Sequence, residues 1–210
     1  KICAVYRAMD NLTKAKWDKA APTFEIMAGG GAERRWKPFK EELFSHMSGR
    51  VLFLALGTGL DIPTFPKNKE ITAIDISPKM LEVAQSRIKA YSGSIKAEVM
   101  DVHELTYEDN SFDQVFTSCT FCSVPNPLNG LRSLRRVLKP DGQLFMFEHT
   151  GSRYYPFKIM MDLMTQITRK MGPDMNRNTV KNVEEAGFEI NEINHLFLDV
   201  VKTIKATNPA

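Results

Sequence analysis

Between residues 50 and 150, short apolar runs alternate with segments whose apolar residues recur at helical spacing. The run Val51–Ala55 is typical of a strand buried on both faces of a parallel sheet. Further strands are expected at residues 70–75, 95–100, 112–118 and 143–148. Helices are expected from Ser77-Pro78, a capping serine followed by a first-turn proline, and over residues 127–138. This alternation predicts parallel βαβ units, which bind ligands beyond the carboxyl ends of their strands.

The chain before this block has a different pattern. Residues 1–48 are expected to be helical, with interruptions at Pro22, at the Gly29–Gly31 run and at Pro38. A triple glycine adopts backbone conformations that other residues avoid, so we expect a loop there. We interpret residues 1–48 as an N-terminal helical segment that caps the active site, and residues 49–210 as the ligand-binding domain.

The chain after residue 150 is expected to complete the sheet. Helices are predicted at residues 156–169 and 176–186, and Gly187 is placed to close the second of them. The last two strands, 188–194 and 196–205, are expected to form an antiparallel hairpin. The fold class predicted is therefore α/β and Rossmann-like, with a mostly parallel seven-stranded sheet and helices on both faces.

Composition and charge restrict the partners. The formal net charge of the 210-residue chain is only +3, which excludes a strongly basic nucleic-acid-binding protein. Residues 1–50 carry ten Lys and Arg against six Asp and Glu. Solvated helix faces account for this excess, and weak contact with a membrane surface or an acidic substrate is the alternative. The three cysteines form neither a disulfide framework nor a metal site, which favours a cytoplasmic protein without a metal.

Polar or small residues stand at three successive strand ends. Ala55-Leu-Gly57-Thr58-Gly59 follows the first strand, where glycine allows a ligand to approach the backbone closely. Asp75 ends the second strand, where a carboxylate can accept hydrogen bonds from both hydroxyls of a ribose. Asp101 ends the third strand and suits the exocyclic amine of an adenine; the alternative is an aspartate that caps the next turn.

A nicotinamide dinucleotide would use the same two features, the glycine loop and the acid after the second strand. Its G-x-G-x-x-G pattern requires a third glycine where this chain has Ile62, followed by Pro63. The phosphate-binding helix would begin poorly there, which disfavours a nicotinamide-dependent oxidoreductase. S-adenosylmethionine has no pyrophosphate and does not need that helix start.

Four segments, taken in order, resemble the successive motifs of class I S-adenosylmethionine-dependent methyltransferases. They are Val51–Gly59, Ile74–Leu81, Ser111–Asp113 and Arg136–Gly142. The resemblance implies that Gly57 and Gly59 face the methionine part of the cofactor, within a binding loop that includes Ala55 and Thr58. It also implies the positions of the residues that hold the rest of S-adenosylmethionine: Asp75 on the ribose, Ile76 and Met80 on the adenine, Asp101 and Val102 at its amine edge, and Cys119 and Thr120 beside the sulfonium.

The chain also departs from that family pattern. Such enzymes usually carry an acid where this chain has Phe53 and a glycine where it has Ala55, and Asp61 is a candidate replacement for the acid. The N-terminal segment is similar to quinone C-methyltransferases and bacterial phospholipid N-methyltransferases, with Phe24-Glu25 in place of their Tyr-Asp pair. The Glu148-His149 region resembles membrane-associated thiol methyltransferases. We expect Phe24, Trp36 and Tyr154 to contact the acceptor.

Methyl transfer from a sulfonium requires alignment, exclusion of water and, for some acceptors, removal of a proton. His149, at the end of the fifth strand, is the candidate catalytic base, and a structural histidine is the alternative. A methionine-rich segment from residue 157 to 175 either packs on the core or walls an apolar pocket. We therefore expect transfer to a small apolar or lipid-like acceptor, namely an amino-phospholipid, a quinone precursor or a thiol. The alternative is a module that binds the cofactor without turnover.

Overall fold

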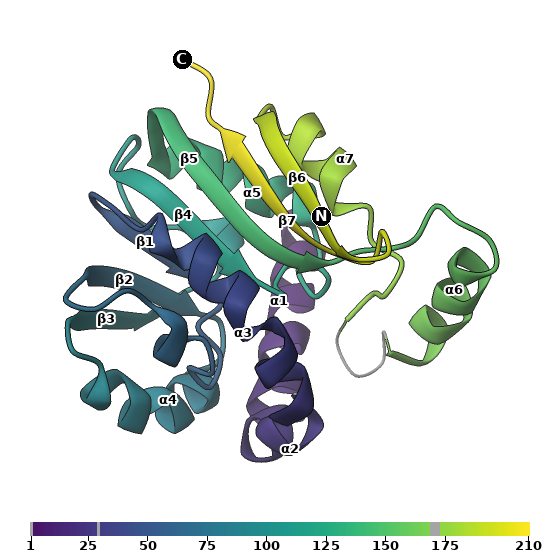
Figure 1. Cartoon of the computed structure of the whole chain (residues 1–210), viewed down its shortest axis with the longest axis horizontal. Coiled ribbons are helices and arrows are strands. Elements are labelled where there is room, and N and C mark those ends of the chain that lie inside the picture. Colours follow the sequence, from purple (N-terminus) through teal and green to yellow (C-terminus); the bar gives the residue numbers. More distant parts are fainter. Residues whose placement is uncertain (1, 29, 169–172) are drawn as a thin grey trace.

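The computed structural model describes residues 2–28, 30–168 and 173–210. Seven strands form one sheet in the order β3-β2-β1-β4-β5-β7-β6 (Figure 1). The strands are β1 (Val51–Leu54), β2 (Glu70–Asp75), β3 (Ser94–Val99), β4 (Phe112–Ser118), β5 (Leu138–His149), β6 (Glu189–Phe197) and β7 (Val201–Thr207). The first five are parallel, and β7 runs antiparallel to both of its neighbours. This arrangement confirms the predicted fold class.

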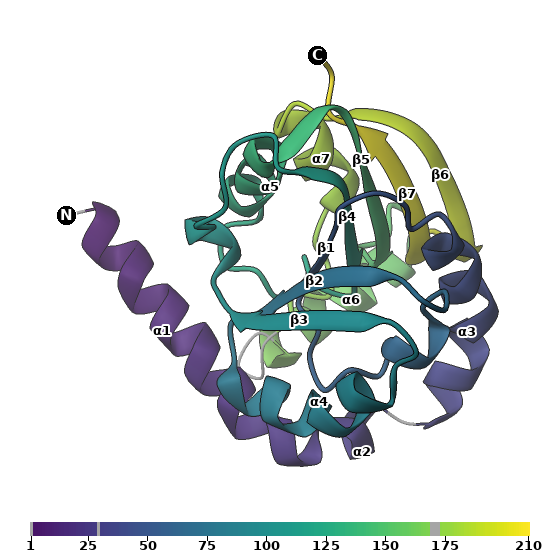
Figure 2. The same cartoon turned by 90° about the vertical axis from the view of Figure 1, so that its left-hand side faces the viewer.

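Helices cover both faces of the sheet (Figure 2). The α-helices are α1 (Ile2–Ala20), α2 (Phe24–Ala28), α3 (Gly30–Ser45), α4 (Pro78–Ala90), α5 (Pro127–Val137), α6 (Phe157–Thr168) and α7 (Thr179–Glu185). Three short 3₁₀ turns are η1 (Ala21–Thr23), η2 (Ile62–Thr64) and η3 (Val102–Glu104). One core cluster contains residues of α5 and α7, and a second contains residues of α3 and α4. No described helix is both long enough and apolar enough to span a bilayer.

The central strands are buried on both faces, as their continuous apolar sequence predicts. All four residues of β1 are buried. Leu52 and Leu54 face the cluster under α5, whereas Val51 and Phe53 face the cluster under α3 and α4. The ring of Phe53 lies 4.8 Å from Phe65 and 5.6 Å from Phe44, so this residue belongs to the core.

The N-terminal segment is more continuous than the sequence suggests. Helix α3 begins at Gly30 and runs through Pro38 to Ser45, so the predicted interruption at Pro38 is wrong. Its last turns bury Leu43 and Phe44 against the sheet, and this packing outweighs the one backbone hydrogen bond that a proline removes. The predicted loop included Gly30, which is helical, and Gly29, which lies outside the described residues. Pro22 does interrupt the helix, within η1.

Two smaller differences concern turns. The predicted turn at residues 139–142 lies inside β5, where Asp141 has a φ of 61° and the register with β4 shifts. Helix α7 was expected to begin at residue 176. It begins at Thr179, because the Asn178 side chain caps it by accepting from the Lys181 amide. Neither difference moves the strand ends that carry the predicted site.

Candidate active site

A cavity of about 370 Å³ lies at the carboxyl ends of the parallel strands. Thirteen of the residues predicted as catalytic, cofactor-binding or acceptor-binding line this cavity. They are Phe24, Trp36, Ala55, Gly57, Thr58, Asp75, Ile76, Met80, Asp101, Val102, Cys119, Thr120 and His149. Gly59 and Tyr154 do not line it. Residues that are far apart in the sequence therefore meet at one edge of the sheet, as the parallel topology requires.

The loop after β1 owes its shape to three left-handed residues. Ala55, Gly57 and Gly59 have φ values of 58°, 59° and 80°. Ala55 adopts this conformation against its steric preference, which explains why a glycine is usual in that place. A Cβ added to Gly57 would meet no atom within 4 Å, whereas one on Gly59 would come within 2.9 Å of Ile62. Gly57 thus leaves open space at the cavity, and Gly59 serves close packing behind the loop.

Asp75 connects this loop to the turn after β2. One of its carboxylate oxygens accepts from the Gly57 amide at 2.8 Å, and the other accepts from the Ser77 amide at 2.8 Å. The residue is only 6% exposed, and burial raises the pKa of Asp75 to about 6. A buried carboxylate can still accept further hydrogen bonds at its remaining lone pairs, and this one lines the cavity.

Asp101 both caps a turn and lines the cavity. Its Oδ1 accepts from the His103 amide at 2.9 Å and lies 2.7 Å from His103 Nδ1. His103 Nε2 lies 3.0 Å from the Asn126 carbonyl oxygen, which holds the imidazole in place. Burial acts to raise the pKa of Asp101, but the hydrogen bonds from His103 outweigh it, and the net shift is downward. Asp101 is therefore an ionised acceptor, and His103 joins the cavity wall.

Glu148 is a site-supporting residue that sequence reasoning missed. It is fully buried, and its Oε1 accepts from the Thr117 hydroxyl at 2.9 Å and from the Thr120 amide at 3.2 Å. The Phe121 amide donates to both carboxylate oxygens. These bonds hold the loop after β4, where Cys119 has a φ of 50°. Burial raises the pKa of Glu148 to about 7. A carboxylate within the apolar run Phe145–His149 is the sequence feature that could have identified it.

His149 has the properties of a neutral base. It lines the cavity, and its Nδ1 is buried with no hydrogen-bond partner among the described residues. Burial, and secondarily the charge of Lys202, lowers the pKa of His149, so the imidazole is neutral at pH 7. Neither the Cys119 thiol nor the Cys122 thiol has the lowered pKa of an activated nucleophile. The exposed surface of Cys119 lines the cavity, yet the surrounding protein raises the pKa of its thiol, and burial raises that of Cys122 to about 12.

An ion pair forms another part of the wall. Lys40 of α3 and Asp61 lie 2.7 Å apart, and their side chains are 5% and 13% exposed. Lys40 Nζ also lies 5.3 Å from the centre of the Phe147 ring. Sequence reasoning singled out Asp61 but not Lys40, because nothing local indicates a contact across 21 positions. Phe53, which replaces the usual acid, does not line the cavity.

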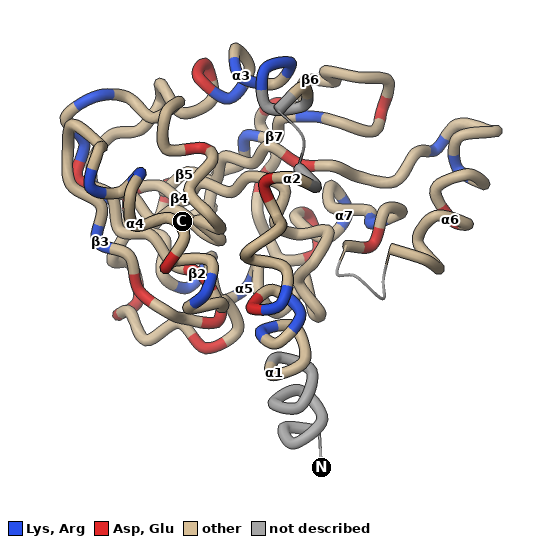
Figure 3. Tube along the Cα trace, turned by 90° about the horizontal axis from the view of Figure 1, so that it is seen from below, with Lys and Arg blue, Asp and Glu red and all other residues tan. Residues whose placement is uncertain are grey.

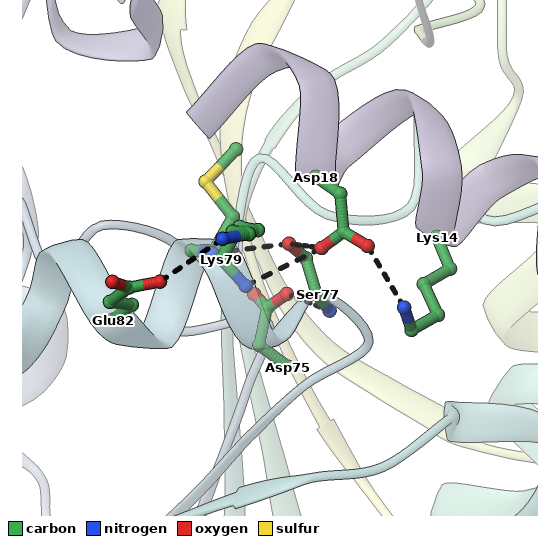
Figure 4. Close-up of polar contacts among 7 residues, drawn as sticks. Lys14, Asp18, Asp75, Ser77, Lys79 and Glu82 are labelled. Carbon is green, nitrogen blue, oxygen red and sulfur yellow. Dashed lines mark hydrogen bonds and ion pairs between the residues drawn. The ribbon is translucent and has the colours of Figure 1, made fainter. Parts of the chain in front are cut away.

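The N-terminal segment contacts the site at two places. Asp18 of α1 accepts from the Ser77 hydroxyl at 2.6 Å and from the Lys79 amide at 3.4 Å, and Lys14 pairs with it at 2.9 Å (Figure 4). Glu25 of α2 pairs with Arg87 through two contacts, of 2.6 and 3.1 Å. Arg87 in turn donates to the Thr58 carbonyl at 3.0 Å. Thr13, Trp17 and Phe24 line the cavity from this segment.

Comparisons with known proteins show the family to which the chain is related. Residues 52–146 match the family model described as a methyltransferase domain. A ubiquinone/menaquinone biosynthesis C-methyltransferase of Geotalea daltonii is 30% identical over 152 residues, which are 68% of this chain and 65% of that protein. The chain thus spans just under two thirds of the length of that relative.

Two further comparisons separate fold from reaction. The human thiol S-methyltransferase TMT1B is 32% identical over 173 residues, which are 75% of this chain and 70% of that protein. Among solved structures, the cyclase SpnF superposes with a TM-score of 0.71 at 18% identity, covering 94% of this chain and 96% of that one. Because the same fold serves a cyclase, the fold alone does not define the reaction.

Proposed function

Because the chain belongs to the class I S-adenosylmethionine-dependent methyltransferases, we propose that it transfers a methyl group from that cofactor to a small apolar or lipid-like acceptor. The observation that carries the proposal is the pair formed by Gly57 and Asp75. An open glycine backbone and a buried carboxylate, joined by a 2.8 Å hydrogen bond, line the same cavity. This pair suits a ligand with an amino-acid end and a ribose.

The residues present fit the cofactor along the whole row of strand ends. We assign the loop from Ala55 to Thr58 to the amino-acid part, Asp75 to the ribose hydroxyls, and Asp101 to the adenine amine. Ile76, Met80 and Val102 offer apolar contacts on either side of the base. When bound, S-adenosylmethionine supplies an electrophilic methyl group on a sulfonium. We place that group near Cys119 and Thr120, on the loop that Glu148 holds.

The remaining wall of the cavity is mostly apolar. Trp36, Phe147 and Val201 line it, and Phe24 adds a ring from the N-terminal segment. The rings of Trp36 and Phe147 lie 6.0 Å apart. Lys40 is paired with Asp61, so this wall presents no unbalanced charge from that pair. Such a surface favours an apolar acceptor and excludes water from the reaction.

His149 is proposed as the group that takes a proton from the acceptor. A neutral imidazole on the wall suits a thiol or a quinol, each of which loses a proton as it is methylated. An amino-phospholipid also loses a proton, and it remains the third acceptor class of the proposal. Residues 1–48 are proposed to cover the occupied site, because Asp18 and Glu25 contact the elements that carry Asp75 and Thr58.

A cofactor-binding module without turnover is the second candidate, favoured by Ala55 in a left-handed conformation and by Phe53 in place of an acid. Incubation with methyl-labelled S-adenosylmethionine and a panel of thiols, quinols and amino-phospholipids separates the two. Label on a thiol, a quinol or an amino-phospholipid supports the proposal. Cofactor binding without transfer to any panel member would support the module. A nicotinamide-dependent reaction is disfavoured, because the glycine loop leads into η2 rather than a phosphate-binding α-helix.

A further inference from the structure

Helix α6 exposes most of its apolar side chains. Ile159, Met160, Leu163, Met164 and Ile167 are between 40% and 70% exposed, and we call them the outer face of α6. Only Met161 and Thr165 of this helix are buried. Figure 1 shows α6 beyond the edge of the sheet, attached by the connection that follows β5. Of the methionines in this helix, Met161 packs in a core cluster, Met160 and Met164 face outward, and none of the three lines the cavity.

The polar residues of α6 form a separate stripe. Lys158, Asp162 and Gln166 recur at intervals of four, and the first two form an ion pair at 2.9 Å. The helix therefore has a narrow buried face, a polar face and a broad apolar face directed away from the protein. A helix with these faces lies in the interface of a lipid bilayer, with its apolar side toward the acyl chains.

The segment leading into α6 has the composition of a membrane interface. Tyr154 and Tyr155 are 52% and 70% exposed, and Tyr side chains concentrate where headgroups meet acyl chains. Arg153 lies 4.9 Å from the Tyr154 ring and donates to its hydroxyl. The connection holds one cation, Arg153, and Lys158 follows in the first turn of α6; Figure 3 draws Lys and Arg in blue along this part of the chain. These cations are complementary to anionic headgroups.

The same surface continues to the cavity. Ser152 and the Arg153 amide donate to Asp199, which ties the start of the α6 connection to the β6–β7 turn. Phe197, at the end of β6, and Leu198, which begins that turn, are 43% and 50% exposed. The guanidinium of Arg35 lies 4.6 Å from the Phe197 ring and 4.7 Å from the ring of Trp36, a cavity residue. These contacts therefore join the start of the α6 connection, through the β6–β7 turn and Arg35, to Trp36 of the proposed acceptor site.

We propose that the outer face of α6 and the β6–β7 turn dock on an anionic lipid membrane, from which the acceptor enters the cavity. The route of the acceptor rests on the proposed function, whereas docking itself does not. A bilayer needs no matching shape, and so it accepts a helix that offers scattered Ile, Leu and Met side chains. A protein partner or a second copy of the chain would bury them by complementary packing instead.

Flotation with vesicles tests the proposal without any acceptor. Vesicles of phosphatidylcholine are compared with vesicles that also contain 30% phosphatidylglycerol. We expect the protein to float with the anionic vesicles and to bind them at least fivefold more weakly at about 0.5 M salt. The variant Leu163→Glu/Ile167→Glu should reduce binding at least tenfold. Val99→Glu, at an apolar position on β3 that is 53% exposed, should change it less than twofold.

The outcomes are distinct. Absence of the wild-type protein from floated anionic vesicles, or equal binding by the α6 variant, would overturn the proposal. Sedimentation velocity adds a second criterion: a wild-type dimer that the α6 variant converts to a monomer would assign this face to a contact between copies. Calorimetry with S-adenosylhomocysteine should give the same affinity for both variants and the wild type, so failure of docking is distinguishable from failure of the proposed function.

Discussion

Asp18 on α1 accepts a 2.6 Å hydrogen bond from the hydroxyl of Ser77, across 59 positions of the chain (Figure 4). The amide of that same serine donates to Asp75. The N-terminal segment is thereby linked, through one residue, to the carboxylate that we assign to the ribose. Closure of this segment and occupancy of the cofactor site should depend on each other.

Asp18→Ala should weaken binding of S-adenosylhomocysteine three- to tenfold, because about 1 kcal/mol of hydrogen bonding between α1 and the β2–α4 turn is lost. Asp18→Asn keeps an acceptor oxygen for Ser77 and should restore most of the affinity. Titration calorimetry measures both, and limited proteolysis of the N-terminal segment should be faster in the alanine variant alone. Equal affinities for all three proteins would show that α1 does not contribute to the site.

Cofactor binding should depend on pH through Asp75. Burial raises the pKa of Asp75 to about 6, and a carboxylate that accepts from ribose hydroxyls must be ionised. The affinity for S-adenosylhomocysteine should therefore be constant above about pH 7 and fall below pH 6, by up to about tenfold per pH unit. Asp75→Asn should abolish this dependence. A wild-type affinity that stays constant from pH 5 to 8 would contradict the ribose assignment.

His149→Gln should lower kcat about 10²- to 10⁴-fold with a thiol or quinol acceptor, because the proton acceptor is removed. The affinity for S-adenosylhomocysteine should not change. Burial lowers the pKa of His149, so the wild-type rate should fall only as pH drops below about 6.5, where the imidazole becomes charged. The variant should lack this acidic limb. If its rate equals that of the wild type, His149 has a structural role.

Glu148 should make the fold less stable as pH rises. Its pKa is about 7 in the folded protein against 4.5 as the ordinary value, so the folded state binds more protons than the unfolded state between these pH values. The free energy of unfolding should fall as pH rises through this window and level off above pH 7. Asp75 contributes in the same direction at lower pH, mainly below pH 6.

The matched variant is Glu148→Gln, which keeps the Oε1 that accepts from Thr117, Thr120 and Phe121. Urea unfolding should show its stability relative to the wild type increasing by about 1 kcal/mol between pH 6 and pH 8. A difference that is the same at both pH values would mean that Glu148 does not titrate in this range.

The strand ends were predictable because parallel topology brings them to one edge whatever the loops do. Ala55, Asp75 and Asp101 could therefore be placed from the sequence. Contacts between distant segments could not, because no local pattern encodes them: Lys40 meets Asp61, and Glu148 reaches the amides of the loop after β4. Gly59 was assigned to the cofactor on its motif alone, yet its backbone is needed for packing against Ile62.

Helical continuity and surface exposure were also beyond local reasoning. Pro38 and Gly30 both favour a break, but the burial of Phe44 on the sheet holds α3 together. The methionines of α6 have the composition of a core helix, and only the structure shows that Met160 and Met164 face outward while Met161 is buried. The composition of a helix shows how much apolar surface it could bury. It does not show whether the fold places another surface against that side of the helix.

The central claim is that Asp75 and the open backbone at Gly57 bind the nucleoside and amino-acid ends of the cofactor. Calorimetric titration of S-adenosylhomocysteine into the wild-type protein and Asp75→Ala at pH 7.5 tests it most directly. We predict saturable binding at one site, weakened at least tenfold by the substitution, as expected for about 1.5–3 kcal/mol of charge-assisted hydrogen bonding. No saturable heat with the wild-type protein, or identical affinities for the two proteins, would contradict the account.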